Sequence, residues 1–234
     1  MRVDAIILAR GGSKGIPNKN IVDFCNKPLL IWTIEQCLNS KLINDVWVSS
    51  DDKKILEIAD ASGVNLITRP DSISADESSS ESGWAHAIEY LKSQKVNADI
   101  ILAPQVTSPL RESKDFDFAI EKFISRKYDS LFSASAVNDL FFWKKNEKGL
   151  LKSINYDYKN RQRRQNFQEQ IIENGSFYLF KPNILLETNN RLGGKIGCYK
   201  MEFWKMFEID DIADLKLCTA IMNEFVELKG TNND

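Results

Sequence analysis

The feature that most constrains this chain is a strand pattern that runs directly into a glycine-rich loop. Residues 3–9 form an apolar run rich in β-branched side chains. Such a run is typical of a strand buried on both faces of a parallel sheet. The residues that follow, RGGSKGIPNKN, would then lie at the carboxyl edge of the sheet, where open α/β folds bind ligands. We therefore expect a ligand site at this edge.

The composition of the loop indicates which ligand it binds. Its glycines, at positions 11, 12 and 15, let the backbone approach a phosphate chain closely, and Arg10, Lys14 and Lys19 supply positive charge. The loop lacks the G-K-[ST] ending of a P-loop and the G-x-G-x-x-G spacing of dinucleotide-binding proteins. A glycine-rich turn with solvated cations is the alternative, but turn geometry alone does not explain three cations beside three glycines.

The remaining hydrophobic pattern alternates between strands and helices. This order implies right-handed crossovers and a three-layer α/β fold around an open, mostly parallel sheet. The expected strands are residues 3–9, 45–50, 64–68, 99–103, 128–135, 176–180 and 196–201. The expected helices begin at Pro28, cover residues 53–62 and 83–93, and present two apolar faces, one formed by Phe116, Ile120, Phe123 and Ile124 and the other by Leu215, Cys218, Met222 and Phe225.

The length of 234 residues suits one domain, which we place at residues 1–229, followed by a frayed tail at 230–234. The character of the chain changes at residues 136–175, where short aromatic-rich strands at 140–143 and 150–154 precede a basic run. We interpret this segment as a small β-rich insertion that acts as an interface arm.

Composition excludes several classes of function. With 31 Lys+Arg against 33 Asp+Glu, no overall positive field is present to gather nucleic acid. The single histidine, His86, excludes most zinc hydrolases, and we expect it to be structural or pocket-lining. No apolar run near the start suits a signal peptide or a membrane span, so we expect a cytoplasmic protein. The cysteines form no metal-binding or redox pair and are expected to be buried and reduced: Cys25, Cys37, Cys198 and Cys218.

A second loop, QVTSPLR at residues 105–111, follows another buried strand and so reaches the same edge. Its amide and hydroxyl groups can read a base or a sugar by hydrogen bonds. It can equally be a helix entry, with Ser108 or Ser113 as the cap and Pro109 in the turn.

The basic run Arg161–Gln165 suits a carboxylate substrate, and Asn174-Gly175 is expected to turn the chain between two strands. Nucleic-acid contact, a nuclear-targeting signal and a solvated arm are the alternatives for the basic run.

An acidic motif, EIDD at residues 208–211, is followed by Asp214. If Glu208 and Asp210 alternate along a strand end, both carboxylates point to one side and offer two oxygen ligands to Mg²⁺, with water and phosphate completing the shell. Capping of a helix N-terminus by Asp210 or Asp211 is the alternative, and both roles can hold together.

In this order the motifs resemble the CMP-sialic acid synthetase family, the N-acylneuraminate cytidylyltransferases. The resemblance runs from about residue 3 to 225 and is carried by ILARGGSKGIPNKN, RP with ADESSS, QVTSPLR, RRQ, ENGSFY and EIDDIADL. The related synthetase for the octulosonic acid Kdo opens with a different, PARYGS-type loop. The resemblance implies a Rossmann-like fold of the nucleotide-diphospho-sugar transferase type and a homodimer formed through the 136–175 arm.

The resemblance also implies roles for individual residues. Arg10, Lys19 and Asp210 would be catalytic, and Glu208 and Asp210 would hold Mg²⁺, although the family usually has Asp at the position of Glu208. The CTP triphosphate would contact Arg10, Gly12, Ser13 and Lys19. The rest of the nucleotide pocket would be Gly11, Asn20, Arg69 and Ser80, and the sugar acid would face Gln105, Thr107, Ser108 and Arg164.

The implied reaction is attack by the anomeric hydroxyl of a nine-carbon 2-keto-3-deoxy sugar acid on the α-phosphorus of CTP, which releases pyrophosphate. The sugar would be sialic acid or a close relative, with legionaminic, pseudaminic and deaminated neuraminic acids as alternatives. A CTP-binding homologue with little turnover and an RNA-binding role for the arm are alternatives from other classes.

Replacing Arg10 tests the phosphate assignment. Arg10→Ala should lower turnover by roughly 10²–10³-fold with the fold unchanged, because one preorganised charge donor is lost. The measurement is steady-state pyrophosphate release alongside circular dichroism. Turnover close to wild type would contradict the assignment.

Overall fold

The structure, a computed structural model, describes residues 1–225 except 14, 76, 138–139, 162 and 164–168. The described residues form a seven-stranded sheet in the order β11-β7-β10-β6-β1-β4-β5. Only β10 runs antiparallel to its neighbours β6 and β7, so the expected open, mostly parallel sheet is confirmed. The strands are β1 (Val3–Leu8), β4 (Asp45–Ser50), β5 (Asn65–Thr68), β6 (Ile100–Pro104), β7 (Ser130–Val137), β10 (Gln170–Phe180) and β11 (Ile196–Met201).

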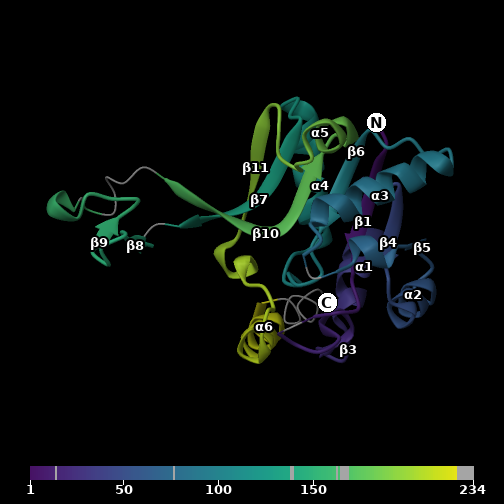
Figure 1. The fold of residues 1–234 in the computed structure, drawn as a ribbon, viewed down its shortest axis with the longest axis horizontal. Coiled ribbons are helices and arrows are strands. Elements are labelled where there is room, and N and C mark those ends of the chain that lie inside the picture. Colours follow the sequence, from purple (N-terminus) through teal and green to yellow (C-terminus); the bar gives the residue numbers. More distant parts are fainter. Residues whose placement is uncertain (14, 76, 138–139, 162, 164–168, 226–234) are drawn as a thin grey trace, which may run out of the picture.

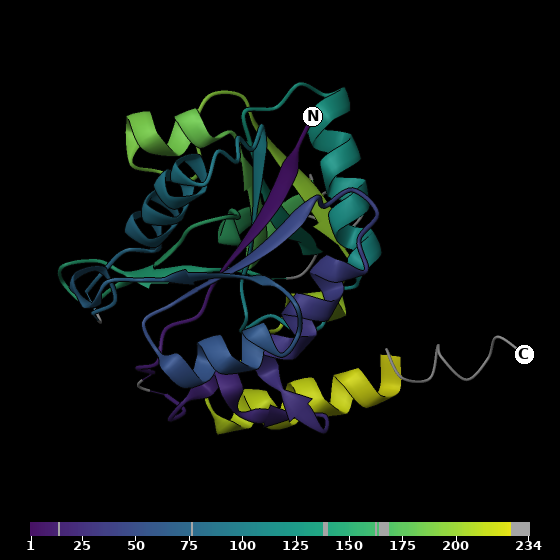
Figure 2. The same cartoon turned by 90° about the vertical axis from the view of Figure 1, so that its right-hand side faces the viewer.

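Helices cover both faces of the sheet, which makes the three expected layers (Figures 1 and 2). One core contains buried residues of α1 (Leu29–Leu38), α2 (Lys53–Asp60), α4 (Ser113–Ser125) and α6 (Ile212–Phe225). The other contains buried residues of α3 (Ser80–Ser93) and α5 (Pro182–Thr188). Strand β1 contributes Val3, Ala5 and Ile7 to the first core and Ile6 to the second, as the alternation of side chains along a strand requires.

Most expected elements are confirmed, and the differences have local causes. The helix expected at Gly83 begins at Ser80, because Ser79 caps it by accepting from the Ser82 backbone amide. Ile124 and Phe225 are exposed rather than core residues, and Cys25 and Cys198 are only partly buried, unlike Cys37 and Cys218. None of the described helices is long and apolar enough to cross a membrane.

The expected turn at Asn174-Gly175 is wrong, because both residues lie within the single strand β10. The pairing of β10 with β7 shifts register between Glu173 and Tyr178, which makes a β-bulge. Gly175 has φ of +67° at the bulge, and Asn174 donates to the Ser135 hydroxyl. A dipeptide that favours a tight hairpin therefore bends one long strand here.

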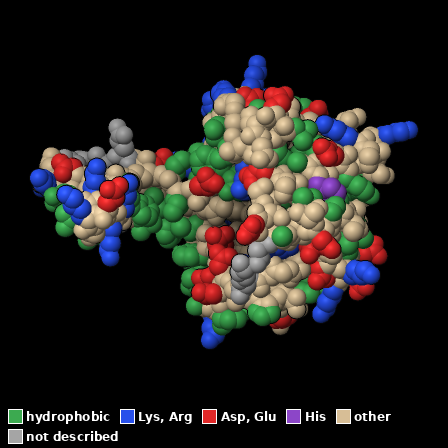
Figure 3. Space-filling view, in the orientation of Figure 1, with side chains coloured by type: hydrophobic (Ala, Val, Ile, Leu, Met, Phe, Trp, Pro, Cys, Tyr) green, Lys and Arg blue, Asp and Glu red, His purple; other side chains and the backbone are tan. Residues whose placement is uncertain are grey.

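The insertion projects from the body as an arm that carries the hairpin of β8 (Trp143–Lys145) and β9 (Leu151–Ser153) (Figure 1). Its rings pack on one another: the centroids of Phe141 and Tyr156 are 4.4 Å apart, and those of Trp143 and Tyr158 are 5.3 Å apart. Hydrophobic side chains also gather on the surface where the arm leaves the body (Figure 3). Exposed apolar residues of the arm include Leu140, Phe142, Leu150, Leu151 and Ile154.

A buried lysine joins the 3₁₀ helix η5 (Phe203–Met206) to the start of α4. Lys205 Nζ lies 2.7 Å from Glu112 Oε2, 2.8 Å from Asp115 Oδ2 and 2.7 Å from Glu202 Oε2. Burial alone would lower the pKa of Lys205, but the hydrogen bonds to these carboxylates outweigh it and the pKa is raised. The cluster fixes the segment that leads into residues 208–211.

Lys205→Met should destabilise the protein by about 3 kcal/mol, because it leaves carboxylates without their buried partner. Desolvation alone would raise the pKa of Glu112, but hydrogen bonds from Lys205 and Lys114 lower it overall. The deficit should therefore be full at neutral pH and shrink as the pH falls and Glu112 is protonated. Urea unfolding at several pH values measures it, and Lys200→Met, which removes the exposed partner of Glu169, should leave the midpoint unchanged.

Candidate active site

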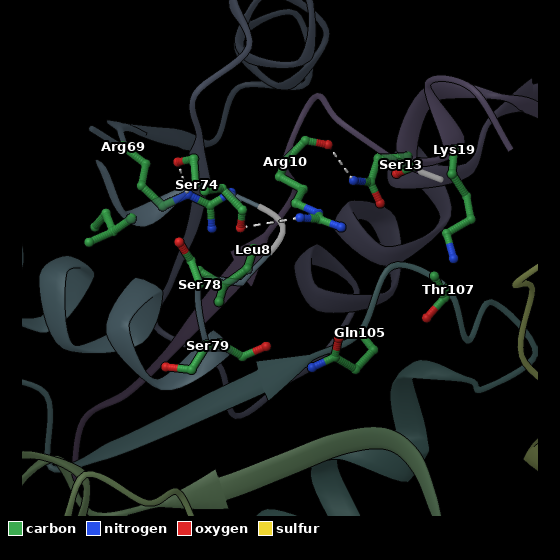
Figure 4. A pocket seen from close by; sticks show the side chains of 14 residues that line it. Leu8, Arg10, Ser13, Lys19, Arg69, Ser74, Ser78, Ser79, Gln105 and Thr107 are labelled. Atoms are coloured by element: carbon green, nitrogen blue, oxygen red, sulfur yellow. Dashed lines mark hydrogen bonds between the residues drawn. The ribbon is translucent and has the colours of Figure 1, made fainter. Parts of the chain in front are cut away.

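A cleft of about 330 Å³ opens at the carboxyl ends of β1, β5 and β6 (Figure 4). Cations and hydroxyl groups dominate its lining, which suits an anionic, hydrogen-bonding ligand. The lining residues are Leu8, Arg10, Ser13, Lys19, Asn20, Arg69, Ile73, Ser74, Ala75, Ser78, Ser79, Ser80, Gln105 and Thr107.

The glycine-rich loop is held in place at its first turn. The side-chain amide of Asn20 donates to the Arg10 carbonyl at 2.9 Å, which ties the two ends of the loop together. The Gly11 amide donates to Asp51 Oδ1 at 3.2 Å. A side chain at Gly11 would lie 2.7 Å from the Asp52 carboxylate, so this position needs glycine. The guanidinium of Arg10 reaches across the cleft to the Ala75 carbonyl at 3.3 Å.

Arg69, at the end of β5, forms the opposite wall. Its Nε donates to the Ser74 hydroxyl at 3.0 Å and its Nη2 to Asp51 at 3.4 Å. Burial lowers the pKa of Arg69, and Asp51 partly offsets this effect. Because Asp51 also accepts from the Gly11 amide, one carboxylate aligns both walls.

Three consecutive serines, residues 78–80, bring hydroxyl groups to the N-terminus of α3. Ser78, Ser79 and Ser80 all line the cleft. The positive end of a helix dipole and its unpaired amides favour a negative ligand at such a terminus. These serines and the cationic loop therefore both favour a negatively charged ligand.

The loop after β6 is organised by Arg111, which is 1% exposed. Its guanidinium donates to the carbonyls of Gln105 and Ser176 and to the Thr33 hydroxyl, at 2.8, 3.2 and 2.7 Å. Burial lowers the pKa of Arg111 to about 10, so it stays charged at neutral pH. Gln105 and Thr107 reach the cleft, and Arg111 holds the turn beneath them.

Ser108 does not face the cleft, contrary to the expectation. It is 1% exposed, and its hydroxyl has no hydrogen-bond partner among the described residues. Its carbonyl accepts from Arg111, so the turn directs the side chain inward. Ser108 is not the helix cap either, since Glu112 and Asp115 form a capping box at the start of α4.

The acidic motif packs directly against both loops. The Ile209 amide donates to the Thr107 carbonyl at 2.7 Å, and Lys19 Nζ lies 2.7 Å from Asp210 Oδ1. A side chain at Gly15 would approach the Asp210 carbonyl to 2.2 Å. The Asp214 carboxylate accepts from the Asp210 amide at 3.0 Å. Residues far apart in the sequence thus meet at one end of the cleft.

The carboxylates of this motif suit a divalent cation. Mg²⁺ is a hard cation that binds carboxylate oxygens in proteins. Desolvation raises the pKa of Glu208, the Asp210 carboxylate raises it further, and Lys19 partly offsets this rise. Lys19 already supplies a cation to Asp210. No group of three or more metal-binding side chains exists among the described residues, so a metal here would take its remaining ligands from phosphate and water. The capping role is also confirmed for Asp211, which accepts from the amides of Ala213 and Asp214 at the start of α6.

The structure therefore brings most of the expected residues together. Arg10, Ser13, Lys19, Asn20, Arg69, Ser80, Gln105 and Thr107 line one cleft. Gly11 and Gly12 belong to the loop without lining the cleft. Asp210 is joined to the lining by its ion pair with Lys19, and Glu208 is not a lining residue. His86 is not among the lining residues. Lys14 and Arg164 lie outside the described residues.

Two kinds of residue were missed by the sequence analysis. Asp51 acts through a carboxylate that only the fold places beside Gly11 and Arg69. Its position directly after a strand that ends at the same edge was the available signal. Ser78 and Ser79 entered the sequence analysis only as part of the ADESSS motif, and Ser74 was not singled out.

A model of the cytidylyltransferase family matches residues 5–218. The chain belongs to this family. N-acylneuraminate cytidylyltransferase A of Danio rerio is 37% identical over 211 residues, which cover 89% of this chain and 48% of that protein. Pseudaminic acid cytidylyltransferase of Campylobacter jejuni is 35% identical over 222 residues, which cover 92% of this chain and 94% of that protein. The chain thus spans about half the length of the first cytidylyltransferase and nearly all of the second.

Solved structures confirm the fold class. The structure of CMP:2-keto-3-deoxy-manno-octonic acid synthetase complexed with CTP matches with a TM-score of 0.71 at 16% identity, over 96% of this cytidylyltransferase chain and 99% of the other. A 4-diphosphocytidyl-2C-methyl-D-erythritol synthase matches with a TM-score of 0.69 at 11% identity, over 94% and 99% of the two chains. At these identities the likeness shows the fold alone.

Gly15→Ala should destabilise the protein by about 1–3 kcal/mol, the usual cost of overpacking. The added methyl group would meet the Asp210 backbone and force the loop away from the acidic motif. Denaturant unfolding measures the loss. Gly12→Ala is the matched control, because nothing lies within 4 Å of its new methyl group, and its midpoint should stay at the wild-type value.

Proposed function

We propose that this protein transfers CMP from CTP to the anomeric hydroxyl of a nine-carbon 2-keto-3-deoxy sugar acid and releases pyrophosphate. The observation that carries this proposal is the shared cleft. Arg10, Ser13 and Lys19 line it together with Gln105 and Thr107, so one cavity offers cations for a phosphate chain and polar groups for an acceptor. Membership of the cytidylyltransferase family supports CTP as the nucleotide.

The names of the relatives support a sugar acid as the acceptor. One is called an N-acylneuraminate and the other a pseudaminic acid cytidylyltransferase, at 37% and 35% identity. Because these identities are so close, sialic acid and pseudaminic acid are both candidate substrates. Legionaminic and deaminated neuraminic acids extend the same class.

In this proposal one set of residues binds the triphosphate and another binds the rest of the nucleotide. Arg10, Gly12, Ser13 and Lys19 bind the triphosphate through side-chain charge, a hydroxyl group and backbone amides. The rest of the nucleotide is held by Gly11, Asn20, Arg69 and Ser80. The sugar acid lies against Gln105 and Thr107, with Arg164 proposed to pair with its carboxylate.

Positioning and charge neutralisation supply most of the acceleration in a transfer of this kind. Arg10 and Lys19 neutralise charge that develops on the phosphate oxygens as pyrophosphate departs. Glu208 and Asp210 would hold Mg²⁺, which when bound polarises phosphoryl oxygens as a Lewis acid. Gln105 and Thr107 orient the acceptor hydroxyl for in-line attack.

A homodimer through the arm is part of the proposal. The arm exposes several large apolar side chains, and soluble monomers rarely expose apolar patches of this kind. A second copy of the chain would cover them. Location in the cytoplasm remains a prediction from the sequence.

Pyrophosphate release with CTP and Mg²⁺ tests the reaction. The acceptors are N-acetylneuraminate, its deaminated analogue, legionaminate, pseudaminate and Kdo, with a chelated blank for each. We expect release with a nine-carbon acid and none after chelation. CTP binding without release for any of the five sugars would favour the weakly active homologue instead.

A further inference from the structure

The ion pair between Lys19 and Asp210 joins two parts of the site that the reaction uses differently. Lys19 Nζ lies 2.7 Å from Asp210 Oδ1. The lysine side chain is 15% exposed, whereas the aspartate side chain is 67% exposed. Most of the lysine side chain is thus covered by the protein, whereas the aspartate side chain that it contacts is open to solvent.

The contact between these two side chains opposes the binding of their proposed ligands. A carboxylate oxygen binds Mg²⁺ at about 2.1 Å, which would place the dication beside the ammonium group. Like charges repel at such a short separation, and the ammonium group repels a dication more strongly than a single charge. The ammonium group and the metal therefore compete for Asp210.

We propose that Lys19 is a displaceable internal counter-ion that keeps divalent metal off Asp210 until a triphosphate draws the ammonium group away. The proposal rests on the proposed function, since it assigns the triphosphate to Lys19 and the metal to Asp210. Nucleotide and metal then bind cooperatively, and metal alone binds weakly. Lys19 is in position for this exchange, because it lines the cleft together with Arg10 and Ser13.

The acidic motif stays in place when the ion pair breaks, because backbone contacts hold it. The Ile209 amide bonds to the Thr107 carbonyl, and Asp214 accepts from the Asp210 amide. The close packing of Gly15 against the Asp210 carbonyl adds a third contact. Removing the lysine side chain should therefore free the Asp210 carboxylate without moving it.

Binding of Mn²⁺ to the nucleotide-free protein tests the proposal. Free Mn²⁺ is followed by electron paramagnetic resonance for wild type, Lys19→Met and Lys19→Gln. Both variants should bind Mn²⁺ on the order of tenfold more tightly than wild type, because the competing cation is gone. The double variant Lys19→Met/Asp210→Asn should lose this gain.

A charge-matched control separates competition for one carboxylate from a general change in field. Arg10→Met removes one positive charge from the same cleft but leaves the Lys19–Asp210 contact intact, so its Mn²⁺ affinity should stay within about twofold of wild type. Melting temperatures show whether each variant is folded.

Equal Mn²⁺ affinity in wild type and in folded Lys19 variants would overturn the proposal, as would an equal gain in Arg10→Met. The assay contains neither nucleotide nor sugar. Failure here, with pyrophosphate release intact in the wild type, therefore leaves the proposed function standing, whereas loss of release with all acceptors contradicts that function directly.

Discussion

The site depends on one buried positive charge. Arg111 carries its guanidinium into the interior, where an ion is costly unless its donors are satisfied. Its Nη1 and Nη2 donate to the Gln105, Ser108 and Ser176 carbonyls and to the Thr33 hydroxyl, whereas its Nε has no partner among the described residues. These acceptors come from α1, from the turn after β6 and from β10. Since that turn presents Thr107 to the cleft and to Ile209, the buried charge fixes both this wall of the cleft and the attachment of the acidic motif.

The remaining order of the site follows from backbone contacts. The glycine-rich loop, the turn after β6 and the acidic motif are separated by about a hundred residues each, yet they touch through the Ile209–Thr107 hydrogen bond and the packing of Gly15 on Asp210. These backbone contacts hold the two loops and the acidic motif in place, and the side chains of the site project from them. Asp51, which contacts Gly11 and Arg69, extends this network of contacts to the wall of the cleft that Arg69 forms.

Periodic and local signals predicted most of the fold. Strands β4 and β11 occur at the expected residues, and the loops after β1 and β6 reach one edge because parallel strands end there. The errors concern contacts between distant residues. Whether Asn174-Gly175 turns or bulges depends on the pairing of β10 with β7, and the inward direction of Ser108 depends on Arg111. No local sequence pattern shows which distant residues these segments contact. For the same reason the sequence did not show that Asp51 contacts Gly11 and Arg69.

Strand β10 has a mechanical consequence. Its first residues, from Gln170, pair with β7 near the arm, and its last residues pair with β6 beneath the cleft. Paired strands are stiff, so bending concentrates where the ladder is interrupted, at the bulge around Gly175. A Cβ at Gly175 would lie 3.6 Å from the Glu208 carboxylate. The arm is thus joined to the body at a bend that lies beside the acidic motif. A force on the tip of the arm would be transmitted along β10 to the strand residues beneath the cleft.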